Sequence, residues 1–185
     1  MSPRASSYDI IIDAAETVVI EAGASHLTLD AVAAKAGVSK GGLLHHFPNK
    51  HALLIAMVDR QIDKHVAARQ KILETLPEGS SRELKSFVLA VKNRDPRHYN
   101  LGASLSAAVA HDPHLNEPVR KVVKDTYATV TKGSLPFEKA SMIALAAEGL
   151  RLLEMLNISP FTNTQRAKVL DHLVRLVDEA AKKEK

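Results

Sequence analysis

Hydrophobic residues recur along the chain at intervals of three and four, which is the spacing of one face of an α-helix. The stretch 28–50, TLDAVAAKAGVSKGGLLHHFPNK, contains two short segments of this kind with a three-residue turn between them. Thr28 and Ser39 are suitable N-cap residues, and Gly37 can adopt the left-handed conformation that ends the first segment. Pro48 ends the second, because the residue before a proline avoids helical dihedral angles. The pattern predicts a helix-turn-helix.

The rest of the chain also has helical periodicity, and no segment alternates in the manner of a β-strand. We therefore predict an all-α fold. Several helices should begin at a capping box, in which two side chains satisfy free N–H groups of the first turn. These boxes are Ser6 with Asp9, Ser80 with Glu83, and Thr162 with Gln165. The predicted helices outside the helix-turn-helix cover residues 6–22, 49–76, 80–93, 99–111, 114–132 and 136–156, and a last one follows 162.

Charge is distributed unevenly around the helix-turn-helix. The whole chain carries a formal net charge of +4, but acidic residues slightly outnumber basic ones in the first fifty, so overall basicity is no argument for DNA binding. The local distribution of charge does favour DNA binding, because no acidic residue lies between Asp30 and Asp59. The bases of this window are Lys35, Lys40 and Lys50, together with the protonatable side chains of His45, His46 and His51.

Two glycines in the second helix favour an interface over simple packing. Gly41 and Gly42 should each cost about 1 kcal/mol relative to alanine in a helix. A helix without side chains can approach another surface closely, and the second helix of this motif enters the major groove of DNA. Lys50 would reach a phosphate from the first turn of the next helix, unless it is simply solvated. The candidate DNA-binding residues are Thr28, Ser39, Lys40, Gly41, Gly42, Leu44, His45, His46 and Lys50.

Two of these candidates have alternative roles. Lys40 can contact a phosphate or the edge of a guanine. Leu44 is either half-buried or an apolar contact to the methyl group of thymine.

The helix-turn-helix also matches a family motif. Thr28, Val32, Ala33, Ala36, Gly37, Val38, Ser39, Gly41, Leu43, His46, Phe47, Lys50 and Leu53 fit T-x-x-x-[IV]-A-x-x-A-G-V-S-x-G-x-[LI]-Y-x-[HY]-F-x-x-K-x-x-L. This pattern resembles the DNA-binding motif of tetracycline repressor (TetR) family regulators. The sequence departs from it at Gly42, where the family often has threonine, and at Leu44, where it usually has a tyrosine that contacts the DNA backbone.

The resemblance and the helix lengths together predict the domain organisation. Residues 49–76 would extend about 42 Å at 1.5 Å per residue, which is too long for a small head alone. The clearest break, Pro-Glu-Gly-Ser-Ser, follows at 77–81. We expect a three-helix DNA-binding domain over 1–50 and a helical ligand-binding and dimerisation domain over 51–185, with 49–76 as the linking helix.

The last two predicted helices are apolar over a wider arc than a surface helix needs. One packing partner can be the chain's own core. The other can be the same helices of a second chain, in an isologous four-helix interface; complete burial within one chain is the alternative. The candidate interface residues are Leu150, Leu153, Val169, Leu173, Leu176 and Ala180.

The middle helices offer candidates for a ligand pocket, although such residues more often form ordinary core. By the resemblance, an unidentified small-molecule effector would bind there and change the spacing of two DNA-binding heads. The expected function is a homodimeric, sequence-specific repressor that the effector releases from a double-stranded DNA operator. The alternative is a helical ligand- or partner-binding protein whose head no longer reads DNA. The pocket candidates are Phe87, Val91, Tyr99, Leu105, Tyr127, Met142, Leu145 and Glu148.

Other classes of function find little support in the sequence. It contains no nucleophile elbow, P-loop or glycine-rich phosphate motif, so we expect neither enzyme activity nor a cofactor. It contains no cysteine, and His45 and His46 would point about 100° apart on a helix, so we expect no metal site. No apolar run reaches the roughly 20 residues of a membrane span, and the first residues lack a signal-peptide core. We therefore expect a cytoplasmic protein without a membrane partner.

Overall fold

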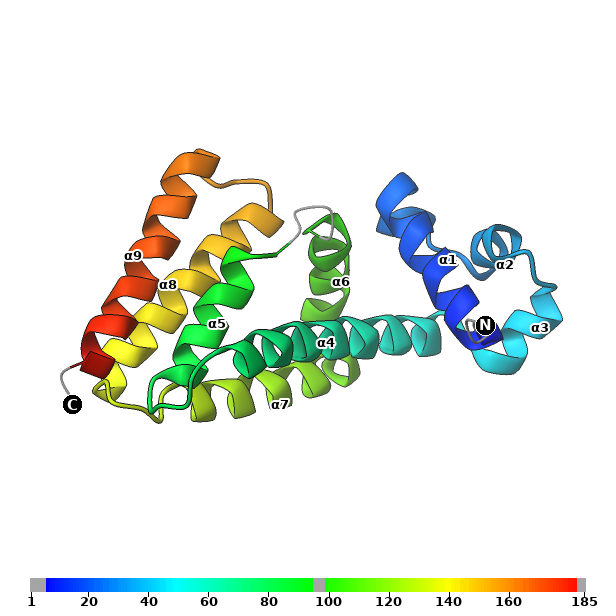
Figure 1. The fold of residues 1–185 in the computed structure, drawn as a ribbon. Helices are drawn as coiled ribbons and strands as arrows, with labels where there is room; N and C mark the ends of the chain where they lie inside the picture. The colour runs from blue at the N-terminus through cyan, green and yellow to red at the C-terminus, as the bar shows by residue number, and fades with distance from the viewer. Residues whose placement is uncertain (1–5, 95–98, 183–185) are drawn as a thin grey trace. The chain divides into compact units, whose positions relative to one another are not determined.

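The structure, a computed structural model, describes residues 6–94 and 99–182. Every regular element in these ranges is a helix, which confirms the predicted fold class (Figure 1). The elements are α1 (Ser7–Ala22), η1 (Ala24–His26), α2 (Leu29–Ala36), α3 (Lys40–His46), α4 (Lys50–Thr75), α5 (Arg82–Lys92), α6 (Tyr99–His111), α7 (Pro113–Val130), α8 (Phe137–Met155) and α9 (Asn163–Lys182).

The chain folds as two compact units. Unit 1 comprises Met1–Ile62 and Asn100–Val119, and unit 2 comprises Asp63–Tyr99 and Arg120–Lys185. Helices α4 and α7 each contribute one part to unit 1 and the other part to unit 2. The head that we predicted over residues 1–50 falls within unit 1.

The local signals at the helix ends of unit 1 act as predicted. The Ser6 hydroxyl caps α1, accepting a hydrogen bond from the Asp9 N–H at 3.2 Å and lying 2.7 Å from the Asp9 carboxylate. Gly23 and Gly37 follow α1 and α2 with φ angles of 89° and 67°. Glycine suits both positions, because a Cβ atom is strained at positive φ.

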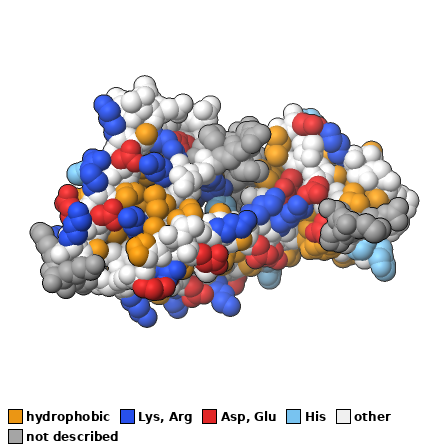
Figure 2. Space-filling view, viewed as in Figure 1, with side chains coloured by type: hydrophobic (Ala, Val, Ile, Leu, Met, Phe, Trp, Pro, Cys, Tyr) orange, Lys and Arg blue, Asp and Glu red, His pale blue; other side chains and the backbone are white. Residues whose placement is uncertain are grey.

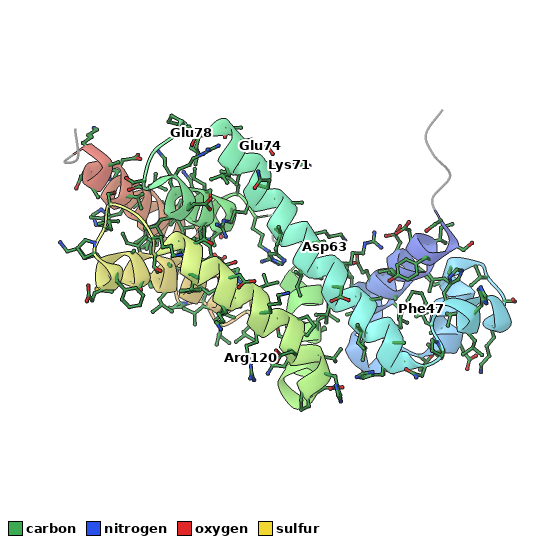
Figure 3. All side chains as sticks on the ribbon, turned by 90° about the horizontal axis from the view of Figure 1, so that it is seen from below. Phe47, Asp63, Lys71, Glu74, Glu78 and Arg120 are labelled. Carbon is green, nitrogen blue, oxygen red and sulfur yellow. The ribbon has the colours of Figure 1, made fainter. Side chains whose placement is uncertain are left out.

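A hydrophobic core and a buried polar contact hold unit 1 together. Leu43 of α3 and Leu53 of α4 are completely buried in a cluster that α1, α2, α6 and α7 also line. Phe47, labelled in Figure 3, directly follows α3 and is buried in the same cluster. Gln61 of α4 donates a hydrogen bond of 3.0 Å to the buried Glu16 carboxylate of α1. Helix α4 therefore begins as part of the head and is not merely attached to it.

Unit 2 has a separate core. Helices α5, α8 and α9 lie side by side (Figure 1) and bury apolar residues such as Val88, Ala144 and Leu170 completely. Salt bridges line this packing, among them Lys85 of α5 with Asp178 of α9 at 2.6 Å.

One predicted helix start in unit 2 is wrong and another is confirmed. We expected Ser80 and Glu83 to cap α5, but the helix starts after Ser81, which provides no side-chain cap. Glu83 instead forms a salt bridge with Arg69 of α4, and the Ser81 hydroxyl bonds to that of Ser134. A tertiary contact has taken the Glu83 side chain that the local pattern assigned to a cap.

The box predicted at the start of α9 is present. The Thr162 N–H donates to the Gln165 side chain at 2.9 Å, and the Gln165 N–H donates to the Thr162 hydroxyl at 3.3 Å. The two residues satisfy each other within one turn of chain, so the local pattern decides the conformation.

Candidate nucleic-acid interface

Helices α2 and α3 form the predicted helix-turn-helix. Thr28 caps α2, accepting from the Ala31 N–H at 3.1 Å, and Ser39 caps α3, accepting from the Gly42 N–H at 3.0 Å. Both side chains are nevertheless exposed. These two DNA-binding candidates therefore have a structural role of their own, which is to set where the two helices begin.

The outward face of α3 is not covered by other described parts of the chain. Lys40, Gly41, Leu44 and His45 are all exposed, whereas Leu43 points into the core. A Cβ atom added at Gly41 would meet nothing within 4 Å. Packing within the described chain therefore gives no reason for a glycine at this position. The close approach of a binding partner's surface would give one.

Gly42 differs from Gly41. A Cβ atom there would lie 3.2 Å from the Ser39 hydroxyl oxygen, which is held in place as the cap of the same helix. The cap thus provides a partial structural reason for the second glycine.

The cationic window is partly neutralised by ion pairs. Lys40 Nζ lies 2.8 Å from an Asp30 carboxylate oxygen, and Lys35 Nζ lies 2.7 Å from Glu21. Lys50 is exposed at the first position of α4, and none of the described residues forms an ion pair with it. Lys50 is therefore the lysine of the window that is most available to a phosphate.

Aromatic rings form a row from α1 to α3. The half-buried His46 ring lies 5.3 Å from that of His45 and 6.3 Å from that of Tyr8, measured between ring centroids. Tyr8 also packs on Phe47 at 4.9 Å. Tyr8 was absent from our candidates, because nothing in its local sequence indicates a contact with α3.

A histidine-carboxylate contact joins the starts of α4 and α7. His51 Nε2 lies 2.8 Å from Asp112 Oδ2, and the His114 N–H donates to Asp112 Oδ1 at 2.9 Å. Desolvation by burial acts to raise the pKa of Asp112, but the hydrogen bonds from the His114 backbone and from His51 outweigh it and lower that pKa. Nowhere in the described part of the chain do three or more His, Asp or Glu side chains gather as metal ligands would.

The pocket candidates in unit 2 separate into two groups. The rings of Phe87 and Tyr127 meet edge to face at 6.1 Å, and Val91 is buried in the same core. Met142 and Leu145, which we expected to line a pocket, are instead 70% and 59% exposed on α8. They are exposed because the opposite face of α8 packs in the core.

Two further pocket candidates lie elsewhere. Leu105 belongs to the core of unit 1, not to unit 2. Tyr99 is the first residue of α6, but its side chain lies outside the described part of the structure.

An ion pair lies near the two aromatic candidates. Glu148 accepts two hydrogen bonds from the Arg151 guanidinium, one of them 2.9 Å long. Burial raises the pKa of the Tyr127 phenol, the Glu148 charge raises it further, and Arg151 opposes the shift.

The dimer candidates are placed differently from our expectation. Leu150 and Leu173 are only 6% and 7% exposed and belong to the core of unit 2, so they offer little surface to a partner. Val169 is exposed. Leu153, Leu176 and Ala180 are half-buried.

Four exposed apolar residues on α8 and directly after it form a different stripe, which sequence reasoning missed. Met142, Leu145 and Leu152 of α8 and Leu156, which follows the helix, lie three, seven and four residues apart, on the face opposite the core. Gly149 continues the row, and a Cβ atom there would meet nothing within 4 Å. The spacing was visible in the sequence, but the sequence did not reveal which face of the helix is covered.

None of the described helices has the length and apolar character that a membrane crossing requires.

An exposed second helix in a helix-turn-helix, on a chain that is otherwise helical, defines the class of helix-turn-helix DNA-binding regulators. The bacterial regulatory proteins of the tetR family match residues 11–57, and the tetracyclin repressor-like C-terminal domain matches residues 81–178. The chain therefore belongs to the TetR family, as predicted, and is a DNA-binding transcriptional regulator. This is a family of regulators and not of enzymes.

Individual relatives agree with this assignment. The chain is 28% identical over 175 residues to the HTH-type transcriptional regulator BetI of Cronobacter sakazakii, covering 86% of this chain and 84% of the relative. The crystal structure of a transcriptional regulator from Rhodococcus sp. Rha1 has a TM-score of 0.76 at 19% identity, over 95% of this chain and 98% of that one. The multidrug binding protein EbrR, complexed with imidazole, has a TM-score of 0.63 at 22% identity, over 92% and 96%.

Proposed function

We propose that the protein is a cytoplasmic, homodimeric repressor that binds a double-stranded DNA operator and leaves it when a small-molecule effector binds. Residues 1–50 would form the DNA-binding domain, and residues 51–185 the ligand-binding and dimerisation domain, with 49–76 as the link. The observation that supports the proposal most strongly is the exposed face of α3, which carries Gly41, Leu44 and His45. Packing within the described chain does not explain the glycine on this face.

On the DNA, α3 would lie in the major groove with the Gly41 backbone close to it. Leu44 and His45 would face the base edges, where a leucine can contact a thymine methyl group and a histidine can hydrogen bond. Lys50 would bind a phosphate at the start of α4, where the free N–H groups of the helix also favour an anion. Thr28, Ser39, Gly42 and His46 would support the same interface.

The exposed stripe on α8 supports the homodimer. Alternating spacings of three and four residues form a row that can pack against the same row of a second chain, and Gly149 would let the two helices approach closely. Figure 2 shows hydrophobic side chains gathered on the visible face of unit 2, among charged ones. Val169 of α9 would extend the interface, with the half-buried Leu153, Leu176 and Ala180 near its edge.

The effector would bind near the aromatic pair of unit 2. Phe87 and Tyr127 provide apolar ring surface, and Glu148 and Arg151 provide charge beside it. These groups suit a small molecule with an apolar body and a polar substituent. The complex of EbrR with imidazole is an example of small-molecule binding by a protein of this fold, which supports the proposal.

A DNA selection followed by a salt titration tests the proposal. Wild-type protein is incubated with a pool of random-sequence duplexes, the bound fraction is amplified over several rounds, and binding of the enriched duplex is measured at several salt concentrations. Because each phosphate contact contributes about −0.9 to the slope of log K against log salt, Lys50→Ala should flatten the slope by about one unit. No enrichment over random DNA at any salt concentration would overturn the repressor function and favour a protein whose head no longer reads DNA.

A further inference from the structure

Tyr8 places an aromatic ring with a free hydroxyl beside α3. It lies in the first turn of α1 and is 41% exposed. One side of its ring packs on Phe47 at 4.9 Å, and His46 lies 6.3 Å away in an edge-to-face arrangement. No described residue forms a hydrogen bond with the Tyr8 hydroxyl.

The packing fixes where Tyr8 lies relative to α3. Phe47 is buried and follows the last residue of α3 directly, so a ring held on Phe47 keeps its position with respect to that helix. The row Tyr8, His46, His45 leads without interruption from α1 to the exposed face of α3. Tyr8 is thus a neighbour of the proposed DNA interface although it is distant from it in sequence.

The chemistry of this position matches a phosphodiester. A phenol hydroxyl is a hydrogen-bond donor, tyrosine is among the side chains that contact DNA phosphates, and such contacts position a protein on the duplex without reading its sequence. His45 and His46 add positive charge beside it whenever they are protonated. The adjacent Asp9 carboxylate accepts a hydrogen bond from the Ser6 hydroxyl. The Asp13 carboxylate, one turn further along α1, forms a salt bridge with Arg60.

We propose that the Tyr8 hydroxyl donates a hydrogen bond to a phosphate oxygen of the DNA strand beside α3, and that α1 is therefore a contact element of the head in addition to α3 and the start of α4. This inference rests on the proposed DNA-binding function. The contact is neutral and should strengthen binding without releasing a counterion.

The test compares Tyr8→Phe with wild type on the duplex that the wild-type protein selects. The substitution removes only the hydroxyl and keeps the ring that packs on Phe47. Fluorescence anisotropy should give an affinity about tenfold weaker, as expected for losing a hydrogen bond to a charged acceptor. The salt slope should stay the same, and so should the thermal unfolding midpoint.

A matched control lies in the same helix. Thr17→Val removes a hydroxyl that donates to the Asp13 carbonyl within α1, so it should leave DNA affinity unchanged. Equal affinities of Tyr8→Phe and wild type would overturn the inference while leaving the proposed function intact, and so would a loss of affinity that follows a loss of thermal stability. Failure of the wild-type protein to select any duplex would overturn the proposed function itself, and the inference with it.

Discussion

Lys40 Nζ lies 2.8 Å from a carboxylate oxygen of Asp30, so the first residue of α3 is ion-paired with the second residue of α2. Both side chains are largely exposed, and such a pair contributes little to stability. Its consequence lies in binding, because a lysine that is expected to meet DNA already has an anionic partner within the head.

Replacing Asp30 with asparagine should tighten DNA binding. The substitution removes a negative charge near the interface and leaves Lys40 free to pair with a phosphate, which should steepen the salt slope by up to about 0.9. The measurement is a salt titration on the selected duplex. In the control, Lys40→Ala combined with Asp30→Asn should abolish the steepening, and an unchanged slope in Asp30→Asn alone would show that Lys40 does not reach a phosphate.

Replacing Gly41 with alanine should change stability and binding in opposite directions. The added Cβ meets no other atom, and alanine is favoured over glycine in a helix by about 1 kcal/mol, so the free energy of unfolding should rise by up to that amount. DNA affinity should fall, because the methyl group would occupy the space where the backbone approaches the groove. Chemical denaturation and anisotropy measure the two effects.

Gly42→Ala is the matched comparison for that substitution. Its Cβ would lie 3.2 Å from the Ser39 cap, so the gain in stability should be smaller than at Gly41. If Gly41→Ala bound the selected duplex as tightly as wild type, close approach of the backbone at Gly41 would be contradicted.

The stripe on α8 predicts a homodimer that charged substitutions within the stripe should dissociate. Wild-type protein should have a mass of about 40 kDa in light scattering, twice the chain mass of 20.1 kDa. Leu145→Glu combined with Leu152→Glu should give a monomer at micromolar concentration, because two charges would be buried against the same stripe of the partner.

A control for the dimer experiment is Val66→Glu, which adds a charge at an exposed apolar residue on a different helix, α4. This variant should remain dimeric. A monomeric wild type at the same concentration would rule out the homodimer.

Tyr127, in the proposed effector site, should ionise at a higher pH than an ordinary tyrosine. Burial and the charge of Glu148 raise the pKa of Tyr127 above the ordinary value of 10.0, so the folded state favours the neutral phenol. The stability that this shift contributes is fully present below pH 10.0 and is lost as the pH rises through the folded-state pKa. The difference in tyrosinate absorbance between wild type and Tyr127→Phe should therefore have its midpoint above pH 10.0.

Glu148→Gln provides the matched variant for this titration. Removing the negative charge should move the midpoint downward, although burial would still hold it above the ordinary value. A midpoint at or below pH 10.0 in wild type would contradict the environment described for Tyr127.

Local signals in the sequence predicted the helix ends wherever no distant residue competes for them. Thr28, Ser39 and Gly37 behave as their chemistry requires, because the groups they satisfy belong to the same turn of chain. Ser80 and Glu83 matched the same kind of signal, but α5 starts after Ser81, whose side chain forms no cap. Arg69 lies on another helix and binds Glu83 there, which no local pattern reveals.

The sequence by itself therefore determined the helical class, the helix-turn-helix and the family, since periodicity, caps and the motif are properties of neighbouring residues. Only the tertiary structure decided which face of α8 is covered, leaving Leu145 exposed and Leu150 buried. It also decided that Lys40 is paired with Asp30 and that Tyr8 lies beside α3. These relationships depend on how separate helices pack, and a helix that is apolar on all sides does not specify in its own sequence which side its neighbours will cover.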